Sequence, residues 1–190
     1  ITLSHFGYIK RLPIDTYKSQ KRGGKGITGM TTREEDFVKE IFTASTHDII
    51  MFFSNKGKLY KLRGYEIPEA GRTAKGTAIV NLLSLDPGEK VSAIIPIQNI
   101  AEGKYLLMAT KNGIIKKTPL SEYDSSRRTG LQGIALKEDD ELISVKLTDG
   151  EDNVVMVTEG GQCITFDEKD VRPMGRVSQG VIGIKLEKDD

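Results

Sequence analysis

The chain has 190 residues, of which 37% are hydrophobic and 29% are charged. This apolar content is enough to form a core and too high for a disordered chain. No apolar run approaches the roughly 20 residues that a membrane-spanning helix needs. The one cysteine, Cys163, excludes an internal disulfide, fits a reducing cytoplasm and is expected to pack as a small apolar side chain.

The net charge of +1 conceals a segregation of charge along the chain. Residues 137–190 hold 7 basic and 14 acidic side chains, a balance of −7, which leaves +8 for residues 1–136. On a finer scale, residues 8–33 are mainly basic and residues 34–48 mainly acidic. Such alternation predicts basic and acidic surfaces on different parts of the fold. The start in mid-pattern, without an initiator Met, also leads us to expect a piece of a longer polypeptide.

An internal repeat organises the chain. In each copy an apolar strand ends in Ser or Thr, two further residues and a glycine follow, and a second strand comes next. The copies of this turn are residues 4–7, 54–57, 110–113 and 158–161. A second glycine follows after 19, 19, 20 and 19 residues, at Gly26, Gly76, Gly133 and Gly180. The turn glycine and the second glycine thus repeat with the same period. They predict a single repeat domain with units at about residues 1–48, 49–104, 105–153 and 154–190.

Strands are the elements that the periodicity predicts along the chain. Residues 91–97 contain Pro96 and β-branched residues, which favour a strand over a helix. Residues 105–110 and 114–118 are predicted to form a hairpin, because Asn and Gly at its turn tolerate a positive φ. Two more strands are expected at residues 131–136 and 141–147, on either side of an acidic turn.

Four strands per unit predict an all-β fold of four-stranded antiparallel blades in a propeller-like array, with four blades in this chain. One blade cannot cover its own edges, so neighbouring blades are expected to pack together. A β-sandwich of unrelated strands is the structural alternative, but it does not require matched spacings.

The segment Gln20-Lys21-Arg22-Gly23-Gly24-Lys25-Gly26 is the most specific motif. Its glycines allow a polyanion to approach the backbone, while amides and cations donate to phosphate oxygens. A nucleotide-binding P-loop needs Ser or Thr after Gly-Lys, whereas Gly26 follows Lys25. A surface loop with incidental charge is the remaining alternative. Arginines recur at residues 71–76, 127–130 and 175–180, which favours binding to a nucleic-acid backbone.

These residues resemble the C-terminal domain of the DNA gyrase A protein family, part of a bacterial type II topoisomerase. The resemblance is carried by Gly7-Tyr8-Ile9-Lys10-Arg11, by residues 17–26, which resemble the family's gyrase A box, and by residues 175–184. Lys21 stands where the family more often has Arg. The resemblance implies a β-pinwheel, a propeller-like disc with strand exchange between blades, normally of six blades.

The resemblance also implies a function, namely sequence-independent wrapping of double-stranded DNA around a basic rim. In the parent enzyme this wrapping would enable ATP-dependent negative supercoiling. The remainder of the gyrase A protein and the gyrase B protein would be partners in an A2B2 complex, in the bacterial cytoplasm at the nucleoid. The resemblance places the catalytic tyrosine, the ATPase and Mg²⁺ outside this chain, in which we expect no catalytic residue, cofactor or metal.

Two alternatives stay open. The C-terminal domain of topoisomerase IV is the related one, although its box is usually degraded. A propeller-like scaffold that binds an acidic protein is the alternative from another class, since fold alone does not settle function.

The candidate DNA-binding residues are the cations at blade edges and the residues of the box, which would hold phosphates without reading bases. They are Lys10, Arg11, Lys18, Gln20, Lys21, Arg22, Gly23, Gly24, Lys25 and Gly26 in the first unit; Lys58, Lys61, Arg63, Arg72 and Lys75 in the second; Lys116, Lys117, Arg127 and Arg128 in the third; and Arg172 and Arg176 in the fourth. The arginines Arg22, Arg72, Arg128 and Arg176 are expected along one edge. His5 and His47 suggest no metal site or triad, and the acidic turns 138–141 and 149–152 lack the EF-hand pattern.

Overall fold

The computed structural model describes residues 1–125, 127–187 and 190. Within these residues the chain forms 14 β-strands and five short 3-10 turns, and no α-helix. The 3-10 turns are η1 (Ile14–Thr16), η2 (Gly64–Glu66), η3 (Ile79–Asn81), η4 (Leu120–Tyr123) and η5 (Glu168–Asp170). The all-β prediction is confirmed.

The strands form three four-stranded sheets and one two-stranded sheet, all with antiparallel pairing. Blade 1 has the order β3 (Val38–Ile41), β1 (Thr2–Ser4), β2 (Tyr8–Lys10), β6 (Thr77–Ala78). Blade 2 has the order β7 (Val91–Ile97), β4 (Ile49–Ser54), β5 (Lys58–Arg63), β10 (Leu131–Gln132). Blade 3 has the order β11 (Leu142–Thr148), β8 (Tyr105–Thr110), β9 (Ile114–Pro119), β14 (Val181–Ile182). Blade 4 comprises β12 (Asn153–Val157) and β13 (Cys163–Asp167) in the described part.

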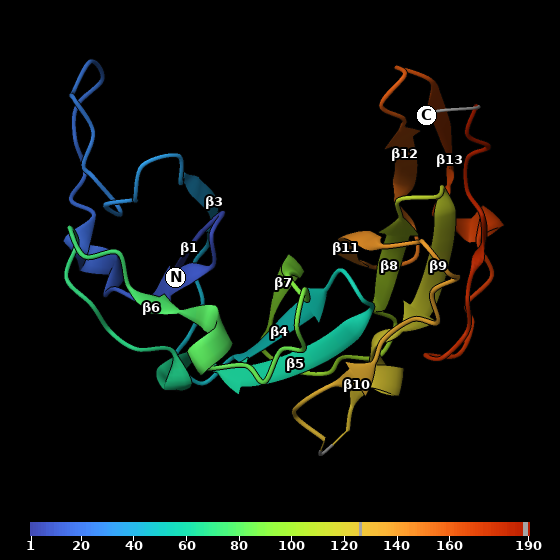
Figure 1. Cartoon of the computed structure of the whole chain (residues 1–190), viewed down its shortest axis with the longest axis horizontal. Helices are drawn as coiled ribbons and strands as arrows, with labels where there is room; N and C mark the ends of the chain where they lie inside the picture. Colours follow the sequence, from blue (N-terminus) through green and yellow to red (C-terminus); the bar gives the residue numbers. More distant parts are fainter. Residues whose placement is uncertain (126, 188–189) are drawn as a thin grey trace.

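The blades follow one another along an arc (Figure 1), which confirms the propeller-like architecture. Strands β3, β7 and β11 face the inner side of the arc, and β6 and β10 lie on its outer side. The sheet orders therefore give every four-stranded blade an inner and an outer edge.

The outer strand of each four-stranded blade comes from the following repeat. Thr77 of β6 pairs with Ile9, Leu131 of β10 with Leu59, and Val181 of β14 with Ile115. The strand exchange that the resemblance implied is thus present. The prediction of a strand over residues 131–136 within the third blade is wrong, because only Leu131–Gln132 is extended and it completes blade 2. The division at residues 48, 104 and 153 stays a prediction.

The glycine before each exchanged strand marks the true phase of the repeat. Gly76, Gly130 and Gly180 directly precede β6, β10 and β14, with φ of 87°, 62° and 95°. The sequence marker Gly133 is therefore wrong, and Gly130 is its structural equivalent. Gly133 instead donates its N–H to the hairpin glycine, Gly57 O, at 2.8 Å. The loop of the third repeat is shorter, and a glycine three residues farther on imitated the regular spacing.

The hairpin predictions are confirmed where local chemistry dictates them. Strands β7 and β8 have the predicted limits, and the hairpin glycines Gly7, Gly57, Gly113 and Gly161 all have a positive φ of 73–85°. An L-residue rarely adopts this conformation, so glycine is required for the tight turn.

Two large apolar clusters lie between consecutive blades. One contains Leu3, Ile9, Phe52 and Tyr60 of blades 1 and 2. The other cluster joins blades 2 and 3 and includes Phe53, Leu106, Met108 and Tyr123. The Phe53 and Tyr123 rings pack edge to face, with their centroids 6.0 Å apart. Burial of these side chains against the next blade fixes the blades side by side. Cys163 is exposed, so its predicted role in packing is wrong.

Candidate nucleic-acid interface

The box loop is a projecting turn held by one glutamine. The Gln20 side chain donates to Gly26 O at 3.2 Å and accepts from Gly26 N at 3.0 Å. Within this clamp Gly24 N donates to Lys21 O at 3.0 Å and closes a tight turn. A Cβ on Gly24 would lie 2.6 Å from Gln20 Oε1, so the clamp needs glycine there.

The clamp leaves the cations of the box in solvent. All residues of the motif are exposed, as is Lys18 before it. Figure 1 shows this segment, in blue, standing away from the sheets at one end of the arc. The prediction of an accessible cationic, glycine-rich loop is thus confirmed, whereas its contact with DNA stays a prediction.

The loops ahead of β6 and β14 contain the same tight turn as the box. Ala74 N donates to Gly71 O at 3.0 Å, and Ser178 N donates to Gly175 O at 3.1 Å. These two loops, residues 71–76 and 175–180, are called exchange loops here, together with Ser125 and residues 127–130 ahead of β10. Exposed or half-buried cations in them are Arg72, Lys75, Arg127, Arg128 and Arg176.

Tyr8 gathers two cations beside the first exchange loop. The Lys75 Nζ lies 5.1 Å from the centroid of the Tyr8 ring, and Arg33 Cζ lies 5.1 Å from the same centroid. Such cation–π contacts hold cations in place without neutralising their charge. Sequence reasoning missed Arg33, whose signal was its position in the basic stretch after the box.

Cations of three repeats meet at a surface hollow of about 580 Å³ between blades 2 and 3. Its lining includes Lys56 and Lys58 of the second repeat, Arg127 of the third and Arg176 of the fourth. The Arg176 guanidinium donates to Gln132 O, which fixes it at this site. Lys56 was missed in the sequence because it belongs to the hairpin turn rather than to a loop with glycine and arginine.

Four predicted contacts are interior lysines. Lys10, Lys61, Lys116 and Lys117 are 0%, 7%, 0% and 4% exposed, and their ammonium groups donate to backbone carbonyls. Burial lowers the pKa of Lys10 and of Lys61. Burial and the positive charge of Arg176 lower the pKa of Lys116 to about 7. The structure does not support DNA contact by these lysines, because a buried ammonium cannot reach a phosphate.

Other predicted cations are on the surface but have protein partners. Arg11 pairs with Glu69 at 3.1 Å, Lys58 pairs with Asp86, and Arg128 pairs with Glu66. Arg63 donates to His47 O at 2.8 Å, and Arg172 is exposed. Surface ion pairs of this kind are weak and screened by salt, so they do not exclude exchange for a phosphate.

The exchange loops occupy equivalent places in the fold. Each directly precedes the outer strand of a blade, so residues 71–76, 127–130 and 175–180 lie along the outer side of the arc (Figure 1). The loop that contains the box stands at one end of the arc (Figure 1). Arg72, Arg128 and Arg176 each belong to a loop that directly precedes an outer strand. A continuous edge of arginines stays a prediction.

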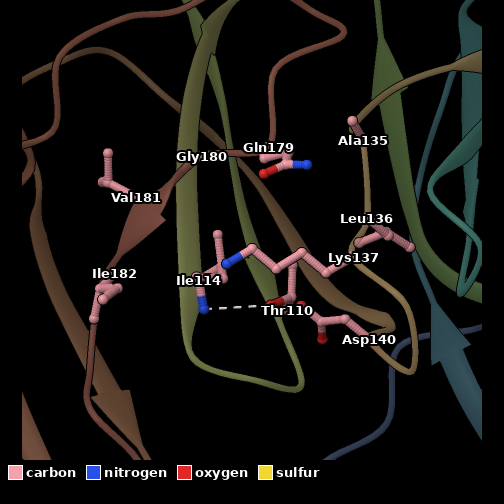
Figure 2. A pocket seen from close by; sticks show the side chains of 10 residues that line it. All are labelled: Thr110, Ile114, Ala135, Leu136, Lys137, Asp140, Gln179, Gly180, Val181 and Ile182. Carbon is pink, nitrogen blue, oxygen red and sulfur yellow. Dashed lines mark hydrogen bonds between the residues drawn. The ribbon is translucent and has the colours of Figure 1, made fainter.

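Two other clusters lack the character of a site. Asp149, Asp152 and Glu168 have ligand atoms within 4.8 Å of one another, but the Glu168 carboxylate already accepts from Thr148 Oγ1 and from Asp152 N. A hollow of about 130 Å³ is lined by Gly180, Val181 and Ile182 of the exchanged strand and by Thr110 and Ile114 of the hairpin. Figure 2 draws these residues. The form of this hollow follows from the exchanged strand, and the Ile114 N–H donates to Thr110 Oγ1 within it.

None of the helices in the described part of the chain has the length and apolar character required to cross a membrane.

The fold defines a propeller-like repeat domain whose blades exchange strands. A family model described as DNA gyrase C-terminal domain, beta-propeller, matches residues 1–45, 48–98, 104–149 and 152–190. The chain belongs to the DNA gyrase C-terminal domain family.

The relatives are A subunits of DNA gyrase from bacteria. The DNA gyrase A protein of Clostridium acetobutylicum is 57% identical over 183 residues, which are 96% of this chain and 22% of that protein. Its counterpart in Halalkalibacterium halodurans is 56% identical over 97% of this chain and 22% of that protein. The DNA gyrase A protein of Staphylococcus aureus is 47% identical over 100% of this chain, which is 22% of that protein. This chain thus spans about a fifth of these relatives.

Two solved structures share the fold. The C-terminal domain of DNA topoisomerase IV matches with a TM-score of 0.84 at 31% identity, covering 99% of this chain and 57% of that one. The DNA gyrase A C-terminal domain matches with a TM-score of 0.76 at 29% identity, covering 99% of this chain and 60% of that one.

Proposed function

We propose that this chain binds double-stranded DNA without sequence preference and wraps it along the outer side of the blade arc. The observation that carries the proposal is the strand exchange, which puts a loop with exposed cations at the same edge of successive blades. Cations and free amides bind phosphate oxygens, which are the same for every base sequence. The contacts would therefore position a duplex rather than read it.

Several blades must act together because DNA is stiff. Bending 20–30 base pairs by 40–90° costs about 1–6 kcal/mol, which one loop cannot supply. The box, the three exchange loops and the cluster at Lys56 and Arg127 offer contacts at intervals along a curved surface. Their spacing along an arc suits a bent duplex better than a straight one.

The parent protein would use this wrap for ATP-dependent negative supercoiling. We infer that the remainder of the gyrase A protein and the gyrase B protein are its partners in an A2B2 complex, as part of the cytoplasmic, nucleoid-associated machinery of a bacterium. As the family resemblance implies, ATP and Mg²⁺ would act elsewhere in that complex.

Duplex binding against salt concentration tests the proposal. If about six phosphates are neutralised, the plot of log affinity against log salt has a slope of about −5. Nicked circles ligated in the presence of saturating protein should also show a change in linking number. A flat salt response, or ligated circles identical to the protein-free control, would contradict wrapping.

The box is tested by changing Lys21, Arg22 and Lys25 together to Ala. The linking-number change should fall more strongly than affinity, because the box lies at one end of the arc while the other loops still bind. The control changes three exposed lysines away from the exchange loops, Lys111→Ala, Lys137→Ala and Lys146→Ala. Equal losses of wrapping and affinity in the box variant would refute a special role for the box.

Topoisomerase IV remains the related alternative, since its C-terminal domain gives the TM-score of 0.84. The relatives at 47–57% identity favour the gyrase A protein. The ligation test separates the two proposals, because strong wrapping by the isolated chain supports supercoiling and weak wrapping supports the alternative. A protein-binding scaffold would show no duplex binding at all.

A further inference from the structure

In each four-stranded blade a buried lysine of the second hairpin strand reaches the exchange loop of the next repeat. The contacts are Lys10 Nζ to Gly71 O at 3.0 Å, Lys61 Nζ to Ser125 O at 3.0 Å, and Lys116 Nζ to Gly175 O at 3.5 Å. Each of these carbonyls lies five residues before the glycine that precedes the exchanged strand. The contact therefore recurs at one place in the repeat, although the lysine comes from either of two neighbouring positions.

At the first exchange loop the ammonium group is fully occupied. Lys10 Nζ donates to Gly71 O at 3.0 Å, to Arg72 O at 2.7 Å and to Ala74 O at 2.7 Å. An ammonium group has three donors, and all three are used on one loop. Lys116 Nζ likewise donates to Gly133 O at 2.7 Å, to Gly175 O and to Arg176 O.

The hydrogen bonds from the lysine to these carbonyl groups determine the direction of the backbone N–H groups of the loop. A trans peptide has its C=O and N–H on opposite sides, so the N–H groups of Arg72, Thr73 and Lys75 are directed away from Lys10. Within the part of the chain that the structure describes, these three N–H groups have no acceptor in the protein. Successive free amides of this kind form a concavity that binds anions. The Arg72 and Lys75 side chains stand in solvent beside it.

We propose that Lys10 and Lys116 are positioning residues, which hold the amides and arginines of the exchange loops toward DNA phosphate without touching the DNA. The inference rests on the proposed function and assigns these lysines a part in it. Both side chains are 0% exposed, so their charge reaches a phosphate only through the loop. A loop without its lysine would be mobile and would have to become ordered on binding.

Variants Lys10→Met and Lys116→Met remove the ammonium group and keep an unbranched apolar side chain. The matched control is Lys117→Met, since Lys117 is the next residue of β9, is 4% exposed and donates to Glu168 O at 2.7 Å, outside the exchange loop. The urea midpoint of each variant shows whether the variant is folded and how stable it is. Duplex affinity is then measured against salt concentration, and hydrogen exchange of the loop amides is measured without DNA.

The expected loss of affinity is about three- to tenfold for Lys10→Met and Lys116→Met, the cost of ordering one or two side chains on binding. The salt slope should not change, and the amides of Arg72 and Thr73 should exchange faster in Lys10→Met. Lys117→Met should bind within about twofold of the unchanged chain, a range well below the ordering cost. Equal losses in all three variants would overturn the inference.

A slope that becomes shallower by about 0.9 for each substitution would also overturn it, because the lysine would then contact a phosphate itself. If the unchanged chain binds no duplex, the proposed function fails, and with it this inference. If the unchanged chain binds and Lys10→Met binds equally well, only the inference fails.

Discussion

Replacing Gly76 by Ala should detach the exchanged strand β6 from blade 1. Gly76 has a φ of +87°, and a Cβ at this position would lie 2.4 Å from Ile9 O. The left-handed conformation alone costs an L-residue about 1–2 kcal/mol. The contact with a backbone oxygen cannot be relieved by a side-chain rotation, so the exchanged strand or β2 must move. We expect a total loss of about 2–4 kcal/mol in the free energy of unfolding, within the range of substitutions that strain the backbone.

Urea unfolding followed by circular dichroism measures this loss. With a slope of about 2–3 kcal/mol per molar urea for a chain of this size, the midpoint should fall by about 1 M. Gly71→Ala is the control, because it lies in the same exchange loop, has no positive φ and has open space around its Cβ position. Its midpoint should stay within about 0.3 M, as for an ordinary surface change. If the two variants unfold at the same urea concentration, Gly76 does not pack closely against Ile9 and the argument for tight strand exchange is refuted.

Three further predictions concern side chains. Gln20→Ala removes both hydrogen bonds between the Gln20 side chain and Gly26. Because exposed hydrogen bonds contribute about 0.5–1 kcal/mol, duplex affinity should fall about two- to fivefold while the urea midpoint stays unchanged. An unchanged affinity would contradict the role of this clamp in DNA binding. Tyr60→Phe removes the 2.8 Å bond to the buried Glu89 carboxylate and should cost about 1–3 kcal/mol by urea titration. The lowered pKa of Lys116 means that the unfolded chain binds more protons above pH 7, so stability should rise with pH between about 7 and 10. This rise should be smaller in Lys116→Met, and an equal rise in both would contradict the burial of its charge.

Local signals in the sequence predict the hairpins and the exposed box. A glycine after two further residues at a strand end predicts each of the four hairpin turns, because few other residues adopt a positive φ. The β-branched residues and Pro96 predict β7 with its observed limits. Glycines and cations at residues 20–26 have nothing to bury, so their exposure follows from composition. In all these cases the deciding interactions are between neighbours in the chain.

The sequence predicted the candidate cations less well, because charge alone does not decide whether a lysine is inside. Lys10 and Lys116 belong to basic stretches like those of the exposed cations. Their burial depends on carbonyl groups of a loop about sixty residues later in the chain, which compensate the lost hydration. The two exposed cations that were missed, Arg33 and Lys56, depend in the same way on contacts with distant residues.

The amino-acid sequence by itself determined the repeat, the hairpin turns and the presence of a cationic glycine-rich loop in this protein. Only the tertiary structure decided which blade each outer strand completes, that Gly130 rather than Gly133 marks the third exchange loop, and which cations remain in solvent. The physical reason is the range of the interactions. A turn is selected by the backbone freedom of its own residues, whereas strand exchange and lysine burial are selected by hydrogen bonds between repeats, whose partners the chain brings together only when it folds.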